Sequence, residues 1–205
     1  SNINIKSSFR DFDFITPQKG DKKTLLDLSL NNIKHYINNE KKKSILFKTK
    51  NHQSRILETI KKDFKLNKTP YHMECFDNSN LQGTNAVSAC VVFKNGKPSK
   101  KDYRHFNVKT VSGPDDFETM KEVVFRRYKR LLSENKKLPE LIIIDGGKGQ
   151  LSSSLEALEA LNLTGKIAIV GIAKRLEEIF FPGDKHPLYL DKRSESLKVI
   201  QHMRN

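Results

Sequence analysis

The stretch Leu141-Ile142-Ile143-Ile144-Asp145-Gly146-Gly147-Lys148-Gly149-Gln150 decides the fold. Its four consecutive apolar residues predict a strand that is buried on both faces, as strands of parallel sheets are. The acid and the glycines that follow predict a turn, and residues 150–163 carry leucines at helical spacing. A buried strand, a tight turn and a helix make up half of a strand–helix crossover. The stretch therefore predicts an α/β domain that contains parallel strands.

Further elements are expected on both sides of this stretch. Three strands are predicted before it, at 72–77, 86–93 and 103–108, and the pair Asn95-Gly96 predicts a hairpin between the last two. A helix follows, capped by Asp115 and reaching residue 134. A strand at 166–173 and a helix at 194–204 come last, with an irregular segment or short hairpin between them. The order β-β-β-α-β-α-β-α is that of a mixed RNase H-like sheet, in which the first strand lies beside the fourth and parallel to it.

The first third of the chain has a helical pattern. Apolar residues at helical spacing predict two helices, 22–43 and 52–64, which the polar run 38–43 separates. Pro70 follows the second helix and cannot continue it. We therefore expect two parts, an N-terminal loop and helical extension over residues 1–69 that packs on the core, and an RNase H-like core over residues 70–205.

The charge of the chain predicts a polyanionic partner. The 205 residues carry a formal net charge of +14, and neutralising phosphates with Lys or Arg releases condensed counterions. Cys75 and Cys90 lie in apolar runs and are expected to be buried and reduced. No apolar stretch is long enough to cross a membrane, and no signal peptide opens the sequence, so we expect a cytoplasmic location. The spacing of a Walker A loop is absent, which disfavours ATP hydrolysis.

Two acids close the strands that the topology makes neighbours. Asp77 ends the first strand and Asp145 ends the fourth, so both should emerge at the carboxyl edge of the sheet, where open α/β sheets place their ligands. Taken singly, each is best explained as a turn or cap residue. Taken together, they favour a shared cation, and Mg²⁺ or Mn²⁺ suits such oxygen ligands. A metal there can polarise a phosphoryl oxygen and activate water.

Two further acids are candidates. Asp116 lies in a first helical turn, where the helix dipole alone would favour it, and a role as a third catalytic acid is equally well supported. Glu74 is expected to share a strand face with Asp77, as a further ligand or a solvated edge residue, and we assign it an accessory role at the site.

Several cations are candidate phosphate contacts. Lys148 lies between glycines at the start of a helix, a position that suits an anion, and it either steadies the scissile phosphate or is a solvated loop lysine. Arg126 and Arg127 belong to a run of four cations on one helix, part of which suits the DNA backbone.

The motifs together resemble UvrC, the nuclease subunit of bacterial nucleotide excision repair. The resemblance is carried by the blocks at residues 17–20, 74–77, 81–83, 103–104, 115–117, 126–128 and 141–151. It implies a metal-dependent RNase H-like endonuclease that makes the 5′ incision beside a lesion in double-stranded DNA and acts with UvrB. It also implies that Asp77 and Asp145 are catalytic, that Asp116 is a further functional acid and that Arg104 belongs with the DNA-binding cations.

The resemblance has departures. The family's catalytic histidine follows an Arg-Asp-Glu-Ala motif that would only be starting at Gln201-His202-Met203-Arg204-Asn205, and His202 is not its equivalent. We therefore expect this chain alone to cut weakly or not at all. Asn78 and Asn80 replace the Ile and His that usually follow the first catalytic acid, which could alter local metal contacts.

Two other functions fit the same sequence. One is a non-catalytic nucleic-acid-binding module on an RNase H-like scaffold. The other is an adaptor whose charge serves a protein partner.

Overall fold

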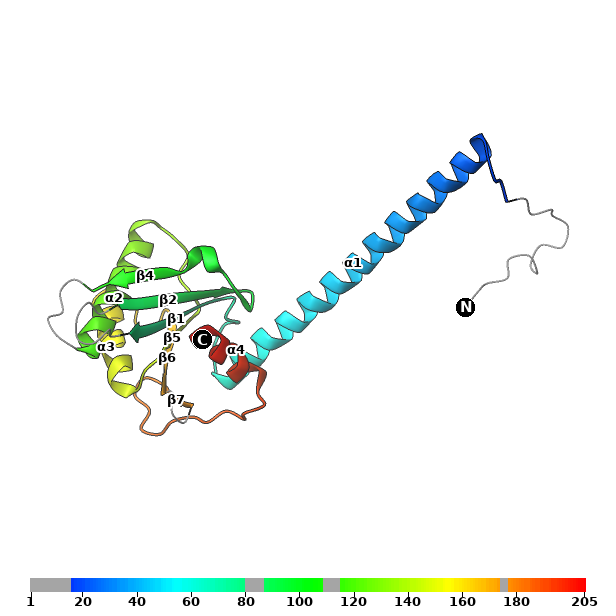
Figure 1. The fold of residues 1–205 in the computed structure, drawn as a ribbon. Coiled ribbons are helices and arrows are strands. Elements are labelled where there is room, and N and C mark those ends of the chain that lie inside the picture. The colour runs from blue at the N-terminus through cyan, green and yellow to red at the C-terminus, as the bar shows by residue number, and fades with distance from the viewer. Residues whose placement is uncertain (1–15, 80–86, 109–114, 174–176) are drawn as a thin grey trace. The chain divides into compact units, whose positions relative to one another are not determined.

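Seven strands form one mixed sheet in the computed structural model, which describes residues 16–79, 87–108, 115–173 and 177–205 (Figure 1). The strands are β1 His72–Ser79, β2 Val87–Lys94, β3 Lys97–Pro98, β4 Arg104–Asn107, β5 Leu141–Ile144, β6 Ala168–Ala173 and β7 Glu178–Phe180. The helices are α1 Asp21–Asp63, α2 Asp116–Ser133, α3 Lys148–Glu159 and α4 Glu195–Arg204, with a short 3₁₀ turn η2 at Lys100–Asp102. The strands pair in the order β3-β2-β1-β5-β6-β7, and β4 also pairs with β2.

The predicted neighbours are confirmed at the centre of the sheet. β1 pairs with β5 in parallel, in a register that sets Met73 opposite Leu141 and Phe76 opposite Ile144. β2 runs antiparallel to β1, β6 runs parallel to β5, and β7 closes the sheet antiparallel to β6. The third predicted strand, 103–108, is β4, which pairs with β2. The two-residue strand β3, which was not predicted, also pairs with β2, and η2 separates it from β4.

Residues with turn and capping preferences determine where β2 ends and where α2 begins. Asn95 and Gly96 both have positive φ, 53° and 74°, as the tight hairpin turn between β2 and β3 requires. Asp115 caps α2, because its carboxylate accepts hydrogen bonds from the backbone N–H groups of Phe117 and Glu118. The segment expected to be irregular or a short hairpin contains β7.

The prediction of two N-terminal helices was wrong, because α1 runs unbroken from Asp21 to Asp63. The polar run 38–43 contains no Pro or Gly, and its Lys and Glu residues are good helix formers. The helix passes through two compact units, Ser1–Lys50 and Asn51–Asn205. Residues 51–69 therefore belong to the same unit as the sheet. The division at residue 69 into an extension that packs on the core and the core itself stays a prediction.

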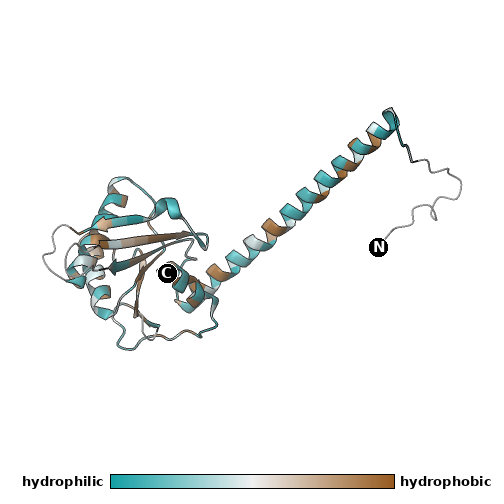
Figure 2. Cartoon of the chain, in the orientation of Figure 1, coloured by the Kyte–Doolittle hydropathy of each residue, from teal (hydrophilic) through white to brown (hydrophobic). Residues whose placement is uncertain are grey.

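The sheet is packed on both faces. The even-numbered side chains of β5 face α2 and α3, and the odd-numbered ones face α4 and the end of α1. All four are fully buried, as the uninterrupted apolar run predicted, and Figure 2 shows this apolar centre in brown. No helix in the described ranges is long and apolar enough to span a membrane.

Glu74 is not at the carboxyl edge, and its predicted accessory role at the site was wrong. It lies three residues before Asp77, so strand alternation points the two side chains to opposite faces. Glu74 is fully buried beneath α2, where Arg127 donates two hydrogen bonds to its carboxylate, from Nε at 3.2 Å and Nη2 at 2.5 Å. Tyr128 Oη donates at 2.9 Å and His72 Nε2 lies 3.1 Å away.

The hydrogen bonds decide the charge of this buried acid. Burial by itself raises the pKa of Glu74, but the bonds from His72 and Arg127 outweigh it and lower the pKa from 4.5 to about 2. The folded-state pKa is lower than the unfolded one, so the network stabilises the fold above pH 4.5 and loses that contribution as the pH falls towards 2. Burial, followed by the charge of Glu74, raises the pKa of the Cys90 thiol beside it. Both cysteines are buried and neither forms a disulfide, as predicted.

Arg127 therefore belongs to the core. Its side chain is 10% exposed and paired with Glu74, so its predicted role on the DNA backbone was wrong. A buried guanidinium with its carboxylate already in place has no free fork for a phosphate.

We expect the second half of α1 to contribute to folding stability and the first half not to. Ile60→Ala removes a fully buried side chain and should lower the free energy of unfolding by about 2–5 kcal/mol. Ile33→Ala, a matched change on the same helix, removes a side chain that is 52% exposed and should leave it within about 0.5 kcal/mol. Urea unfolding measures both, and equal losses would contradict the assignment.

The buried Glu74 network should depend strongly on its cation. Arg127→Met strands a buried carboxylate and should lower the free energy of unfolding by about 3–5 kcal/mol. Arg130→Met, on the same helix, removes a guanidinium that is 69% exposed and pairs with Glu134, so unfolding should hardly change. Thermal and urea unfolding of both variants test this, and a stable Arg127→Met protein would show that Glu74 does not need its partner.

Candidate active site

Asp77 and Asp145 lie at neighbouring positions of two parallel strands. Asp145 directly follows β5, as predicted, but Asp77 does not close β1, because its strand continues to Ser79 in the ladder with β2. The ladder continues past Phe76 and Ile144, because the backbone N–H of Asp145 donates to the carbonyl of Phe76 at 2.8 Å. Adjacent strands are about 4.8 Å apart, so the two acids start from neighbouring backbone positions. Both belong to the odd-numbered face of the sheet, beside α4. The structure therefore brings the two predicted acids to one edge and one face.

Asp145 is buried and faces a cation. Its side chain is 1% exposed, and Oδ1 lies 3.1 Å from Nε of Arg204, near the end of α4. The same guanidinium reaches Glu177 Oε2 from Nη1 at 2.6 Å. Glu177 has a positive φ of 54°, an uncommon conformation for a residue with a side chain. One arginine thus contacts two carboxylates beside the strand ends.

Sequence reasoning missed Arg204 and Glu177. Arg204 lies four residues after Ile200 and seven after Leu197, so it occupies the buried stripe of α4. A cation in an apolar stripe was the available signal, since such a charge needs a partner. Glu177 gave no comparable signal, because its position depends on the turn before β7.

Asp116 reaches the same edge from the other face of the sheet. The side-chain amide of Asn78, one residue after Asp77, donates to the Asp116 carbonyl at 3.1 Å. The next residue, Phe117, lies with its ring against Gly149, where a methyl group would collide with it. The first turns of α2 and α3 therefore pack together, and this contact holds Asp116 near the loop that follows β5.

The glycines after β5 permit a close approach. A side chain at Gly146 would collide with Gln150, and one at Gly171 of β6 would come within 3.0 Å of the Gly146 carbonyl oxygen. The loop therefore lies directly on the neighbouring strand. Gly147 is the N-cap residue of α3 and provides no side-chain cap, and the helix begins at Lys148, three residues after Asp145.

Lys148 turns towards the loop after β7. Its Nζ donates to the carbonyl of Lys185 at 2.6 Å and lies 5.2 Å from the centre of the Phe180 ring. The side chain is exposed and sits at the same edge as Asp145. Its role on a phosphate stays a prediction.

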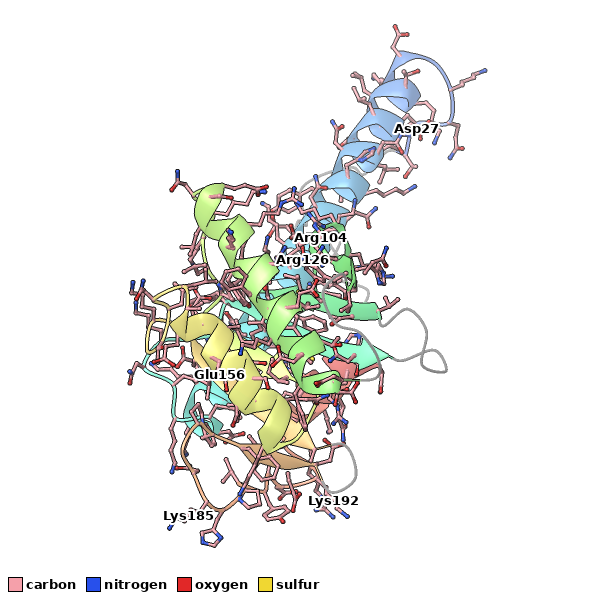
Figure 3. The ribbon with its side chains drawn as sticks, turned by 90° about the vertical axis from the view of Figure 1, so that its left-hand side faces the viewer. Asp27, Arg104, Arg126, Glu156, Lys185 and Lys192 are labelled. Carbon is pink, nitrogen blue, oxygen red and sulfur yellow. The ribbon has the colours of Figure 1, made fainter. Side chains whose placement is uncertain are left out.

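Arg104 and Arg126 lie along β4, where Figure 3 labels both. Arg126 donates to the Asn107 carbonyl at 2.9 Å and to Glu122 at 2.7 Å, and its guanidinium lies 5.8 Å from the centre of the Phe106 ring. Arg104 is exposed, and its guanidinium donates to the carbonyls of Lys101 and Tyr103. Both remain near the surface, unlike Arg127. Asn80 and the block 81–83 lie outside the described residues.

The acids suit a hard cation. No group of three or more His, Cys, Asp or Glu side chains with metal-binding geometry occurs in the described part of the chain. Two carboxylates are nevertheless a sufficient protein contribution for Mg²⁺, which keeps several waters and takes substrate phosphate as ligands. The donor set of Asp77 and Asp145 therefore fits Mg²⁺ or Mn²⁺.

Two pockets lie at the opposite edge of the sheet. One, of about 690 Å³, is lined by residues that include Glu140 and Ile167, and the other, of about 420 Å³, by residues that include His72 and Lys94. Glu140, Ile167 and His72 lie at the amino ends of β5, β6 and β1, and Lys94 ends the antiparallel strand β2. Neither of these two pockets includes Asp77 or Asp145.

Known proteins resemble this chain over most of its length. The chain is 65% identical over 189 residues to the UvrABC system protein C of Flavobacterium johnsoniae, covering 92% of this chain and 32% of that protein. It is 47% identical over 192 residues to the protein of the same name from Methanococcus maripaludis, covering 94% and 34%. The chain spans about a third of the length of these relatives.

Two further comparisons concern the fold and the family. An endonuclease V of Ciona intestinalis, solved with an inosine-containing DNA, is similar with a TM-score of 0.41 and 18% identity, over 74% of this chain and 67% of that one. The model of the UvrC RNAse H endonuclease domain matches residues 61–205, which span the whole sheet, the strand-end acids and α4. The chain therefore belongs to the family of UvrC RNase H endonuclease domains.

Proposed function

We propose that this chain cuts the phosphodiester backbone of damaged double-stranded DNA on the 5′ side of a lesion, as the endonuclease domain of a UvrC-type protein that acts with UvrB. The observation that carries the proposal is the pairing of β1 with β5, which brings Asp77 and Asp145 to one edge. Family membership supports the reaction class. The substrate implies that the protein works in the cytoplasm, where bacterial DNA is.

Asp77 and Asp145 would hold Mg²⁺ or Mn²⁺. The cation supplies Lewis acidity towards the scissile phosphate and lowers the pKa of bound water. The two carboxylates orient the cation, and the burial of Asp145 limits the number of positions that its oxygens can adopt.

The elements around the acids would position the phosphate. The start of α3 presents backbone N–H groups and the positive end of the helix dipole beside Asp145, an arrangement that favours an anion. Lys148 is the first residue of that helix and could exchange its contact with the Lys185 carbonyl for one with a phosphate oxygen. Asp116 would act from the opposite face of the same edge, as a further acid near the reacting groups.

Arg104 and Arg126 would contact the DNA backbone. Backbone contacts need only charge and reach, and both side chains lie at the surface along β4. The charge of +14 supports a large electrostatic share of the binding free energy.

Loss of either strand-end acid should stop the reaction and leave DNA binding in place. In a full-length UvrC-type protein that carries this domain, Asp145→Asn and Asp77→Asn should each lower the rate of 5′ incision by at least about 100-fold, because the cation loses a charged ligand. Asp191→Asn is a matched control, since this exposed acid accepts a bond from the Arg193 backbone that an amide oxygen can also accept. Incision of a defined lesion-bearing duplex measures all three. Normal incision by Asp145→Asn would favour a non-catalytic DNA-binding module.

Arg104 of β4 and Arg126 of α2 should contribute to the salt dependence of DNA affinity. The double change Arg104→Gln with Arg126→Gln should reduce the slope of log affinity against log salt by about 2, since each phosphate contact contributes roughly 0.9. Fluorescence anisotropy with a duplex at several salt concentrations measures the slope. Arg55→Gln on α1, which removes an exposed cation paired with Glu195, should leave it unchanged. An unaltered slope in the double variant would show that Arg104 and Arg126 do not contact the DNA backbone.

A further inference from the structure

Arg204 is a buried cation placed against one of the two metal-binding candidates. Its side chain is 9% exposed, and its Nε lies 3.1 Å from Asp145 Oδ1. A carboxylate as deeply buried as Asp145 is costly to ionise unless an opposite charge lies beside it. The guanidinium provides that charge within the protein itself.

The same arginine is shared with a second acid. Glu177 accepts a hydrogen bond from Nη1 at 2.6 Å, and its side chain is 32% exposed. Asp145 and Glu177 both contact the one guanidinium of Arg204. The guanidinium is therefore held from two sides, with Asp145 on the buried side and Glu177 on the solvent side.

We propose that Arg204 is the resident counter-ion of Asp145 and opposes the binding of a divalent cation at the same carboxylate. The proposal rests on the proposed function, because it takes Asp145 as a metal ligand. A cation on Asp145 would lie within a few ångströms of the guanidinium, and like charges at that distance in a partly buried site repel strongly. Glu177 reduces this opposition, because it offers Arg204 an alternative partner when Asp145 is engaged.

Binding of Mn²⁺ to the DNA-free chain tests this without any activity measurement, for example by the electron paramagnetic resonance signal of free Mn²⁺. Arg204→Gln should tighten binding by about tenfold, because a positive charge leaves the site. Arg204→Lys is the matched control, since it keeps the charge, and should stay within about twofold of the original. Thermal unfolding shows that the variants are folded. Unchanged or weaker binding by a folded Arg204→Gln protein would overturn the proposal.

A second pair of variants tests the part played by Glu177 and serves if Arg204→Gln fails to fold. Glu177→Gln should weaken Mn²⁺ binding by about threefold or more, because Arg204 is then left to Asp145 alone. Glu178→Gln removes the same charge from the next residue, whose carboxylate accepts a bond from Tyr189, and should change nothing. Equal effects of the two changes, or none from either, would overturn the proposal.

Two comparisons separate the possible failures. If Glu177 acts through Arg204, its substitution has no added effect in the Arg204→Gln protein, whereas a direct metal ligand would weaken binding in both backgrounds. Asp145→Asn reports on the proposed function. If Asp145→Asn leaves Mn²⁺ binding unchanged, Asp145 is not a metal ligand and the proposed metal site is refuted. If Asp145→Asn abolishes binding but Arg204→Gln does not change it, the metal site stands and only the role of Arg204 as a counter-ion is refuted.

Discussion

The parallel pairing of β1 with β5 is the constraint on which the rest of the molecule depends. It places Asp77, near the carboxyl end of β1, next to Asp145, the residue after β5, although the two acids are almost 70 positions apart in the sequence. It also fixes which side chains of both strands face α2 and α3 and which face α4. A shift of the register by one residue would send each acid to the opposite face, because strand side chains alternate.

Alternation within β1 separates two acids that the sequence places only three residues apart. Glu74 points to the α2 side, becomes fully buried and receives hydrogen bonds from Arg127 and Tyr128. Asp77 points to the other side, at the open end of the strand. The first carboxylate is saturated with donors and contributes to the stability of the core. The second lies beside Asp145, whose carboxylate contacts Arg204.

Sequence patterns predicted the sheet and its two strand-end acids because both depend on local signals. The run Leu141–Ile144 is apolar throughout, and an acid and glycines follow it. The continuity of α1 was missed, since a polar stretch resembles a break when it contains no apolar residues. The partners of Glu74 and Asp145 were missed for another reason. Arg127 and Arg204 are far away in sequence, and which cation meets which acid is decided only when helices pack on the sheet.

The interior salt bridge beneath α2 has a consequence for how sequences of this kind can diverge. Arg127, Tyr128 and His72 all direct a polar atom to the one carboxylate, and Cys90 lies against it. A single substitution of Glu74 by an apolar residue leaves a buried guanidinium without its acid, and the reverse change leaves the acid alone. Exchange of the set for an apolar one is tolerable only if several positions change together. In related sequences these positions should therefore change together or stay unchanged, because a protein in which only one of them has changed is less stable.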